Sequence, residues 1–381
     1  MPPSSTPKTR SGQEIQAMDA PFRAAGLVRN PRGKCSGIAG RMRLKRMAAE
    51  ELRPAAPVPR VAANGVQWLP VPGWERIGWL WHGFSTRRGG VSRAYCPEDA
   101  PGELNLGFTA DDDRKNVARN RQLLAEAVTG DPATPLVTLR QIHSTILVVA
   151  GAADATRKQP RKSGVPSDRG PQEAVLASWG GSDRSSSLGW KGDGIMTGAP
   201  GLLLGVQTAD CIPVLVADRR RWAVAVFHAG WRGTVNRIVE TGVGRMRLEF
   251  GSRPEDLVAA IGPGIGACCY AVGEEVLSEF ESQFSYAREL FSEVYDSDPV
   301  RTKYPLLFMT QRAPGHSPIG PSLHLDLVEA NRRQLLAAGL KPRSIKVVGG
   351  CTSCQPELFF SHRASQGRAG RMLGVIGIRP S

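Results

Sequence analysis

Two histidines and one cysteine stand at the borders of apolar segments, and together they have the chemistry of a metal site. His143 lies in RQIHS, directly after the apolar run LVTL, and Cys211 lies in TADCIP. His228 ends the run WAVAVFH and begins HAGWRG. Two imidazoles and one thiolate suit zinc and leave a fourth coordination position open. At such an open site the pKa of bound water falls to near neutrality, so hydroxide becomes available.

The same three residues allow other chemistry, and their wide separation in the chain does not choose among the alternatives. Each residue taken singly also fits a buried thiol or a hydrogen-bonded core histidine. Two histidines with one cysteine can bind copper as well as zinc. Cys211 could instead act as a nucleophile, with His228 or His143 as its base, which is the arrangement of a cysteine amidohydrolase.

Long apolar runs predict the strands that would position these side chains. Uninterrupted runs at 202–207, 212–218 and 222–228 are typical of strands buried on both faces. Sites in α/β proteins gather at the ends of such strands. Further strands are expected at 78–86, 136–139, 146–150, 257–262, 344–350, 358–363 and 371–378.

Apolar residues at helical spacing predict helices between these strands. The segment 112–129 is expected to begin at Asp111 as its N-cap. Asp326 and Glu329 form a capping box for a helix that ends at Gly339. The other helices are expected at 234–249 and 274–284. Because strands and helices interleave without a break, we predict one α/β domain over residues 61–381.

The charge of the chain is concentrated at its beginning. Residues 1–46 hold ten Lys and Arg and only two acids, whereas the 381 residues together carry a net charge of +14. Residues 1–60 are therefore expected to form a disordered basic extension. Organelle targeting by residues 1–46 is the less favoured interpretation. The folded part has no concentration of basic residues that would indicate nucleic-acid binding.

Cysteine use and the lack of long apolar stretches indicate a cytoplasmic protein. The seven cysteines follow no disulfide framework, and no apolar stretch reaches the length of a membrane span. Cys351 and Cys354 have the spacing of a redox or metal pair, but we expect them to pack in the core because no second pair of this spacing occurs. Cys268 and Cys269 are expected to be structural too. The Gly- and Ser-rich segment 151–192 is expected to be a flexible insertion.

A set of motifs extends over roughly residues 66–381. Its segments are HGFSTRRGGVS (82–92), NLGF (105–108), QIHS (141–144), GDGIMT (192–197), TADCIPVLVAD (208–218), FHAGWRGTV (227–235), GPGIGACCYAVG (262–273), CTSC (351–354) and FFSHR (359–363). This set resembles the laccase-domain family, which is also called the multicopper polyphenol oxidase or purine nucleoside phosphorylase family and includes bacterial peptidoglycan editing factors. The resemblance implies a single domain of four α/β/β/α layers with mixed sheets, and it implies that His143, Cys211 and His228 are zinc ligands.

Two positions depart from the pattern of the family. His362 stands where the family often has Tyr, and Ala271 stands where Glu is usual. Neither position belongs to the three proposed ligands. The change at Ala271 puts any acid role of that position in doubt.

The resemblance implies a zinc-dependent purine nucleoside phosphorylase, which converts inosine or adenosine and phosphate to the base and ribose 1-phosphate. Methylthioadenosine phosphorylase and adenosine deaminase activities are associated with the same family. The alternative is an amidohydrolase that acts on peptidoglycan precursors. A copper-dependent polyphenol oxidase is disfavoured, because the chain has six histidines and no H-x-H pair. A metal-binding partner protein without activity is the remaining class, and the intact ligand set argues against it.

Five further motif residues are candidates for substrate binding, each with a structural alternative. Arg87, in a Gly-rich turn, could hold phosphate or form a salt bridge. Gln141 could orient His143 or contact substrate, and Asp210 could support a ligand histidine or cap a turn. Trp231 and Arg232 could stack on a purine base, although Trp in such a turn is as often part of the core.

Overall fold

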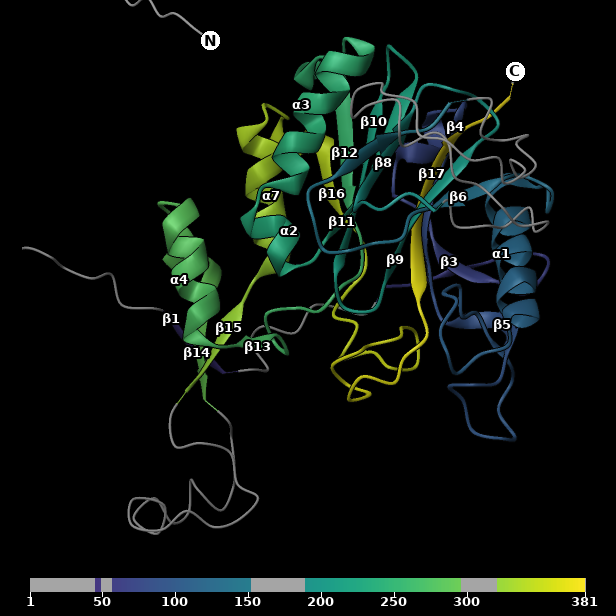
Figure 1. Cartoon of the computed structure of the whole chain (residues 1–381), viewed down its shortest axis with the longest axis horizontal. Helices are drawn as coiled ribbons and strands as arrows, with labels where there is room; N and C mark the ends of the chain where they lie inside the picture. Colours follow the sequence, from purple (N-terminus) through teal and green to yellow (C-terminus); the bar gives the residue numbers. More distant parts are fainter. Residues whose placement is uncertain (1–44, 49–56, 152–188, 296–320, 381) are drawn as a thin grey trace, which may run out of the picture. The chain divides into compact units, whose positions relative to one another are not determined.

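The apolar runs of the sequence become strands of two six-stranded sheets in a computed structural model. The structure describes residues 45–48, 57–151, 189–295 and 321–380 (Figure 1). These residues fall within one compact unit, Arg43–Ser381. Most of the expected N-terminal extension, and residues 152–188 of the expected insertion, lie outside the described residues.

The first sheet has the strand order β16-β12-β10-β11-β8-β7. Its three central pairings are antiparallel, whereas the outer pairs β12·β16 and β7·β8 are parallel, so the sheet is mixed. Its strands are β7 (Leu147–Val149), β8 (Gly194–Thr197), β10 (Ile212–Asp218), β11 (Ala223–Ala229), β12 (Leu257–Ile261) and β16 (Ile345–Val347).

The second sheet has the order β2-β3-β4-β17-β9-β6. It is also mixed, because β6 runs parallel to β9 while the other pairings are antiparallel. Its strands are β2 (Arg60–Val61), β3 (Gln67–Leu69), β4 (Leu80–Ser85), β6 (Leu136–Thr138), β9 (Leu203–Thr208) and β17 (Met372–Ile378).

Alternation of side chains along each strand explains why the runs are apolar throughout. On β10, Leu215 and Ala217 belong to the core between the two sheets, whereas Val214 and Val216 belong to the core under the helices. On β9, Leu204 packs between the sheets and its neighbour Leu203 faces outward. Both faces of each central strand are therefore buried, as the uninterrupted runs predicted.

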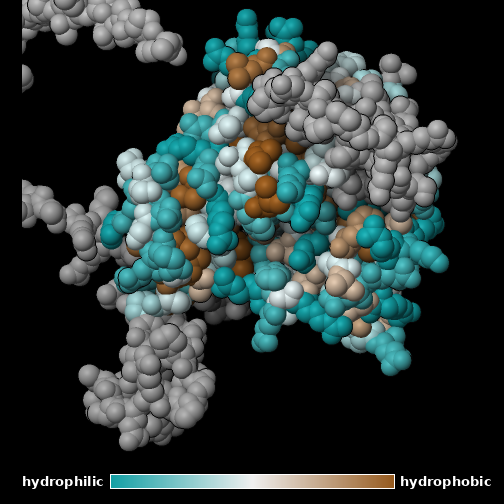
Figure 2. All heavy atoms as spheres, in the orientation of Figure 1, coloured by the Kyte–Doolittle hydropathy of each residue, from teal (hydrophilic) through white to brown (hydrophobic). Residues whose placement is uncertain are grey.

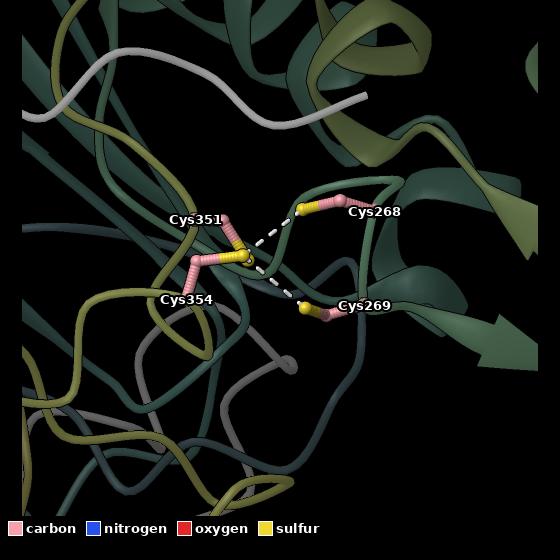
Figure 3. Close-up of side chains that lie close together, drawn as sticks. All are labelled: Cys268, Cys269, Cys351 and Cys354. Carbon is pink, nitrogen blue, oxygen red and sulfur yellow. Dashed lines mark hydrogen bonds between the residues drawn. The ribbon is translucent and has the colours of Figure 1, made fainter. Parts of the chain in front are cut away.

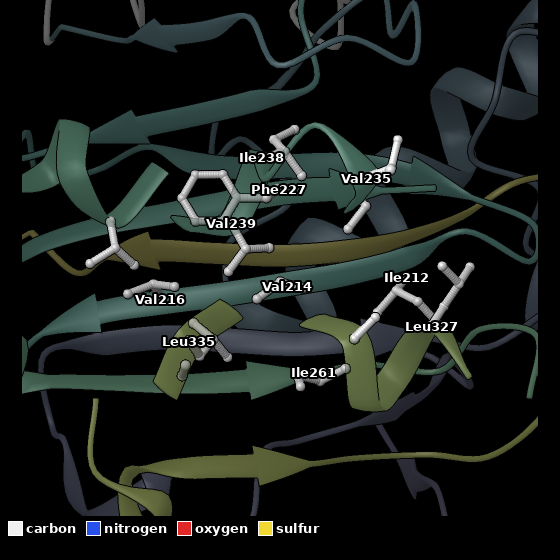
Figure 4. Packing of buried hydrophobic residues seen from close by; sticks show 14 of the residues in the cluster. Ile212, Val214, Val216, Phe227, Val235, Ile238, Val239, Ile261, Leu327 and Leu335 are labelled. Atoms are coloured by element: carbon white, nitrogen blue, oxygen red, sulfur yellow. The ribbon is translucent and has the colours of Figure 1, made fainter. Parts of the chain in front are cut away.

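Helices cover the outer face of each sheet and complete the four layers. α1 (Arg114–Thr129) packs on the second sheet, whereas α3 (Ile238–Phe250) and α7 (Leu327–Ala337) pack on the first (Figure 1). Figure 4 shows Val214 and Val216 of β10 beneath Leu335 of α7. The predicted single α/β domain with four layers is confirmed.

A small sheet and one further helix, α4 (Glu274–Gln283), lie beside these layers. The sheet has the order β1-β14-β15-β13, and α4 follows β13 in the chain. Its strands are β1 (Lys45–Ala48), β13 (Ala271–Val272), β14 (Phe291–Tyr295) and β15 (Ser322–Leu325). β1 falls within the range expected to be disordered. It pairs with β14 through the main chain, a contact that the side-chain pattern does not encode.

Two predicted elements differ in the structure. The helix expected at 234–249 is divided into α2 (Trp231–Val235) and α3, because Arg237 between them adopts a left-handed conformation with φ 60°. The strand expected at 358–363 is absent. Phe359 and Phe360 are buried there, but the amides of Leu358 and Phe359 turn back to the carbonyl of Gln355.

The helix caps agree with the sequence in part. The N-cap of α1 is Asp113 rather than Asp111, since the Asp113 carboxylate accepts the amide of Lys115 at 2.8 Å. Asp326 accepts the amide of Glu329 at 2.9 Å, as the capping box predicted. The reciprocal half of that box is not formed, because the Glu329 carboxylate pairs with arginines further along α7.

On the face shown in Figure 2, the described residues form no large continuous apolar surface. In Figure 2 the apolar residues form small patches bordered by hydrophilic ones. Among the helices of the described ranges, none has both the length and the apolar character needed to cross a membrane.

Candidate metal centre and substrate cavity

A cavity of about 650 Å³ lies where connections pass from one sheet to the other. Cys211 stands in the turn from β9 of the second sheet to β10 of the first. His143 stands in the connection from β6 of the second sheet to β7 of the first. His228 belongs to β11 and points a third side chain to the same place, so all three line the cavity.

The structure brings His143, Cys211 and His228 together, with one possible ligand atom of each within 4.8 Å of the others. Cys211 Sγ lies 4.0 Å from His143 Nε2, and the two imidazole rings are 5.0 Å apart at an angle of 73°. Tetrahedral zinc places sulfur and nitrogen ligands roughly 3.5 Å apart. The donor set and its spacing therefore fit a zinc ion.

Gly230 gives these side chains the space that they need. A Cβ atom at this position would lie 2.8 Å from Cys211 Sγ and 3.3 Å from Cδ2 of His143. A contact of 2.8 Å is closer than real Cβ atoms approach sulfur, so any larger residue would displace the thiol. The glycine of HAGWRG is therefore part of the site.

A buried carboxylate, Asp193, holds two of the three residues. Its Oδ1 lies 2.9 Å from Nδ1 of His228, which leaves Nε2 of that ring for the metal. The amides of His143 and Ser144 donate to the same carboxylate at 3.0 and 2.6 Å, and the Ser144 hydroxyl donates at 2.7 Å. Although burial opposes ionisation, these hydrogen bonds lower the pKa of Asp193 to about 2.

Sequence reasoning did not find Asp193. It lies in GDGIMT, one of the segments that carried the family resemblance, but no role was expected for it. An acid between two glycines before an apolar strand was the available signal.

Backbone strain accompanies the two connections. His143 has φ 58° and Asp210 has φ 94°, values that residues with a side chain seldom adopt. Such conformations persist where surrounding contacts hold them, often at functional sites. At His143 the amide hydrogen bonds to Asp193 supply that support.

Cys211 and His228 each favour the charged form of the other. Burial would raise the pKa of Cys211, but the charge of His228 and hydrogen bonds from both histidines lower it to about 6. Burial would lower the pKa of His228, but the Cys211 charge and Asp193 raise it to about 9. The thiolate required of a zinc ligand is therefore accessible near neutral pH.

Asp210 and Gln141 line the cavity, but their polar groups serve the loops around it. The Asp210 carboxylate accepts the hydroxyl of Thr352 at 2.7 Å and the amide of Arg363 at 2.7 Å. The Gln141 side chain exchanges two hydrogen bonds with the backbone of Gln207, at 2.8 and 2.7 Å. The support of a ligand histidine that was considered for Asp210 belongs to Asp193.

Three residues expected to bind substrate have structural contacts away from the cavity lining. Arg87 pairs with Glu103 at 2.6 Å and donates to the carbonyl of Pro356, so its guanidinium is engaged in a salt bridge. Trp231 packs against the core under the helices, and Arg232 lies over its ring at 4.5 Å. These contacts are those of the structural alternatives, and the expected phosphate and base contacts stay predictions.

Other residues, which the sequence did not single out as substrate contacts, form the cavity wall. Arg363 and Arg371 supply positive charge, and Phe108, Tyr270 and His362 supply aromatic surface. Burial, together with the Cys211 charge, raises the pKa of Tyr270 to about 12. Tyr270 therefore stays neutral and keeps a hydroxyl that can donate a hydrogen bond.

A comparison with known families identifies the family of this chain. Residues 81–379 match the family described as multi-copper polyphenol oxidoreductase laccase. The chain belongs to this family. The matched range includes the three candidate ligands, Asp193 and every cavity residue named above.

Relatives within this laccase family carry names of purine enzymes. The chain is 33% identical over 297 residues to purine nucleoside phosphorylase YlmD of Geobacillus stearothermophilus, which covers 78% of this chain and 89% of that protein. It is 31% identical over 288 residues to adenosine deaminase RL5 of an unknown prokaryotic organism. The matched part covers 76% of this chain and 90% of that protein. The solved structure of YlmD from G. stearothermophilus superposes on this chain with a TM-score of 0.60 at 30% identity. The superposition covers 85% of this chain and 100% of the YlmD chain.

Proposed function

We propose that this protein is a zinc-dependent purine nucleoside phosphorylase that converts inosine or adenosine and phosphate to the free base and ribose 1-phosphate. The observation that carries the proposal is the convergence of His143, Cys211 and His228 in a cavity that is also lined by arginines and aromatic side chains. The names of relatives at 31–33% identity support the same class of substrate.

His143, Cys211 and His228 would hold the metal. Their donor set, two imidazoles and one thiolate, is that of open zinc sites, in which the fourth position is left to water or substrate. When bound, zinc acts as a Lewis acid toward a substrate oxygen or lowers the pKa of water. Asp193 fixes the ring of His228 and the backbone at His143, so the ligands are arranged before the ion arrives.

The chain's own residues provide the contacts that phosphate and a purine need. Arg363 and Arg371 border the cavity, and planar guanidinium groups donate in pairs to phosphate oxygens. Phe108 and Tyr270 line the same cavity and bring aromatic surface to the base. A purine that leaves C1′ takes up negative charge, which the neutral Tyr270 hydroxyl can stabilise by donating a hydrogen bond.

Adenosine deamination is a second activity that the same cavity favours. It is supported by the relative named adenosine deaminase and by the mixed histidine and cysteine donors, which are also the donors of nucleobase deaminases. The older oxidase name has less support. Among the described residues only two histidines, His143 and His228, belong to a group that could share a metal, too few for a trinuclear copper cluster.

The test is a product assay on purified, zinc-loaded protein. With inosine and phosphate, hypoxanthine and ribose 1-phosphate should appear in equal amounts, and neither should form without phosphate. Adenosine should yield adenine and ribose 1-phosphate, and any inosine that forms would report deamination. Nucleosides that remain intact, together with cleavage of an amide in a peptidoglycan precursor, would establish the amidohydrolase instead.

Two variants sharpen this test. Arg371→Ala should raise the KM for phosphate by roughly tenfold while zinc content stays the same, because the variant removes a binding contact and no ligand. Arg247→Ala, on the exposed side of α3, is the matched control and should leave the KM unchanged. An unchanged KM in Arg371→Ala would place the phosphate elsewhere.

A further inference from the structure

A second group of residues with metal-binding side chains does not line the cavity. Cys268 and Cys269 belong to the loop after β12, and Cys351 and Cys354 belong to the loop after β16. One sulfur atom of each lies within 4.8 Å of the others. Figure 3 shows the four side chains pointing toward one another from the two loops. The second pair that the C-x-x-C segment lacked in the sequence is therefore supplied by the fold.

The spacing of the sulfur atoms suits coordination by one ion. Cys354 Sγ lies 3.4 Å from both Cys268 Sγ and Cys269 Sγ. Four thiolates around tetrahedral zinc lie roughly 3.8 Å from one another, which falls between these distances and the 4.8 Å limit. Because Cys354 is equally close to two thiols, no single pair is singled out for a disulfide.

Gly266 contacts the cluster through its amide and leaves space for the sulfur atoms. The amide of Gly266 donates to Cys351 Sγ at 3.2 Å. Gly266 also leaves room, because a Cβ there would lie 3.2 Å from Cys268 Sγ and 3.1 Å from Cys351 Cβ.

The two loops that carry the cysteines meet at the turn before Cys211. Gly264 forms a β-bridge with Cys351, and the Thr352 amide donates to the Gly264 carbonyl at 3.0 Å. Both loops then contact Asp210: the Thr352 hydroxyl donates to its carboxylate, and the Ile265 amide donates to its carbonyl at 2.8 Å. An ion held by all four sulfurs would fasten these loops to each other behind the cavity wall.

We propose that Cys268, Cys269, Cys351 and Cys354 form a second, structural zinc site that joins the loops after β12 and β16. Four cysteine ligands leave no open position, so this zinc takes no part in chemistry and acts as a clip. The proposal does not depend on the reaction at the other site. A protein inactive toward nucleosides would still be expected to hold this ion.

The experiment counts zinc in the full-length chain by elemental analysis after removal of loosely bound metal. The wild-type protein should hold two zinc ions per chain, and Cys211→Ala should keep one. In the Cys211→Ala background, added Cys354→Ser should lower the count to zero, whereas Cys96→Ser, at a free cysteine outside both groups, should leave it at one. A Cys211→Ala protein without zinc would overturn the proposal.

Cobalt gives a readout that does not require the Cys354 variant to fold. Cys211→Ala loaded with cobalt should show the intense thiolate-to-cobalt charge-transfer absorption of a four-sulfur site. Absorption no stronger than that of protein whose thiols have been blocked would contradict the site. A native mass that reveals a disulfide among the four cysteines, or iron in place of zinc, would also overturn it.

Discussion

Asp193 Oδ1 lies 2.9 Å from Nδ1 of His228, and both groups are almost fully buried. Because the same carboxylate also accepts the amide of His143, one side chain sets the ring of one proposed ligand and the backbone of another. The arrangement of the site therefore depends on a residue that does not itself bind the metal.

Asp193→Asn should weaken zinc binding at the candidate centre by roughly 10- to 100-fold, because a neutral amide is a poorer partner for the imidazole. Competition with a chromogenic chelator measures this change. Asp218→Asn is the control, since Asp218 is also buried but accepts backbone amides at the end of β10. Equal zinc affinity in the two variants would show that Asp193 does not support the metal.

Gly230→Ala should disrupt the same centre by sterics alone. The added methyl group would lie 2.8 Å from Cys211 Sγ, so zinc content and activity should fall together. Gly244→Ala, on α3 where a Cβ meets no atom within 4 Å, should keep both and gain about 1 kcal/mol of stability. Elemental analysis and thermal unfolding compare the two, and full zinc in Gly230→Ala would refute the close contact.

Arg87→Ala should change stability rather than phosphate binding. The substitution leaves Glu103, whose side chain is 11% exposed, without its 2.6 Å partner, which should lower the free energy of unfolding by about 3 kcal/mol. Denaturant unfolding and the KM for phosphate are measured on the same sample. A raised KM with unchanged stability would restore the phosphate role that the sequence suggested.

His82 should make the protein less stable in mild acid. Its Nδ1 accepts the amide of Val71, and burial lowers its pKa from 6.5 to about 4. Between these values the unfolded chain binds a proton that the folded chain does not, so stability falls as the pH falls. From pH 7 to pH 5 the loss from this group should be about 2 kcal/mol.

The non-titrating variant His82→Gln isolates this effect. It should lose less unfolding free energy over the same pH interval, as measured by urea denaturation at each pH. Equal losses in the two proteins would mean that His82 is not the responsible group.

The central strands were predictable because a strand that is buried on both faces needs apolar residues at every position, and such a run is visible in the sequence. The segments 202–207 and 212–218 match β9 and β10 closely for this reason. β13 has two residues and is held by main-chain pairing. So short a strand has no apolar run by which it could be predicted. The break at Arg237 was also hidden, because a single left-handed residue does not disturb the apolar spacing around it.

The candidate site, too, contains residues that the sequence predicts and residues that only the fold identifies. His143, Cys211 and His228 could be selected because they carry metal-binding groups at the ends of apolar runs. The choice of Asp193 over Asp210 as the partner of a histidine depends on contacts across the fold, which spacing in the chain does not contain. The same is true of the four cysteines, whose two pairs become neighbours only when the loops after β12 and β16 meet.

The two connections that carry His143 and Cys211 each cross from the second sheet to the first. A metal bound there would lie close to the points where the chain passes between the two halves of the sandwich. An opening that slides one sheet over the other would pull on both connections, and so on two of the three candidate ligands. The rate at which zinc escapes to a chelator would then report how often the sandwich opens, a motion that is otherwise difficult to detect in a folded protein.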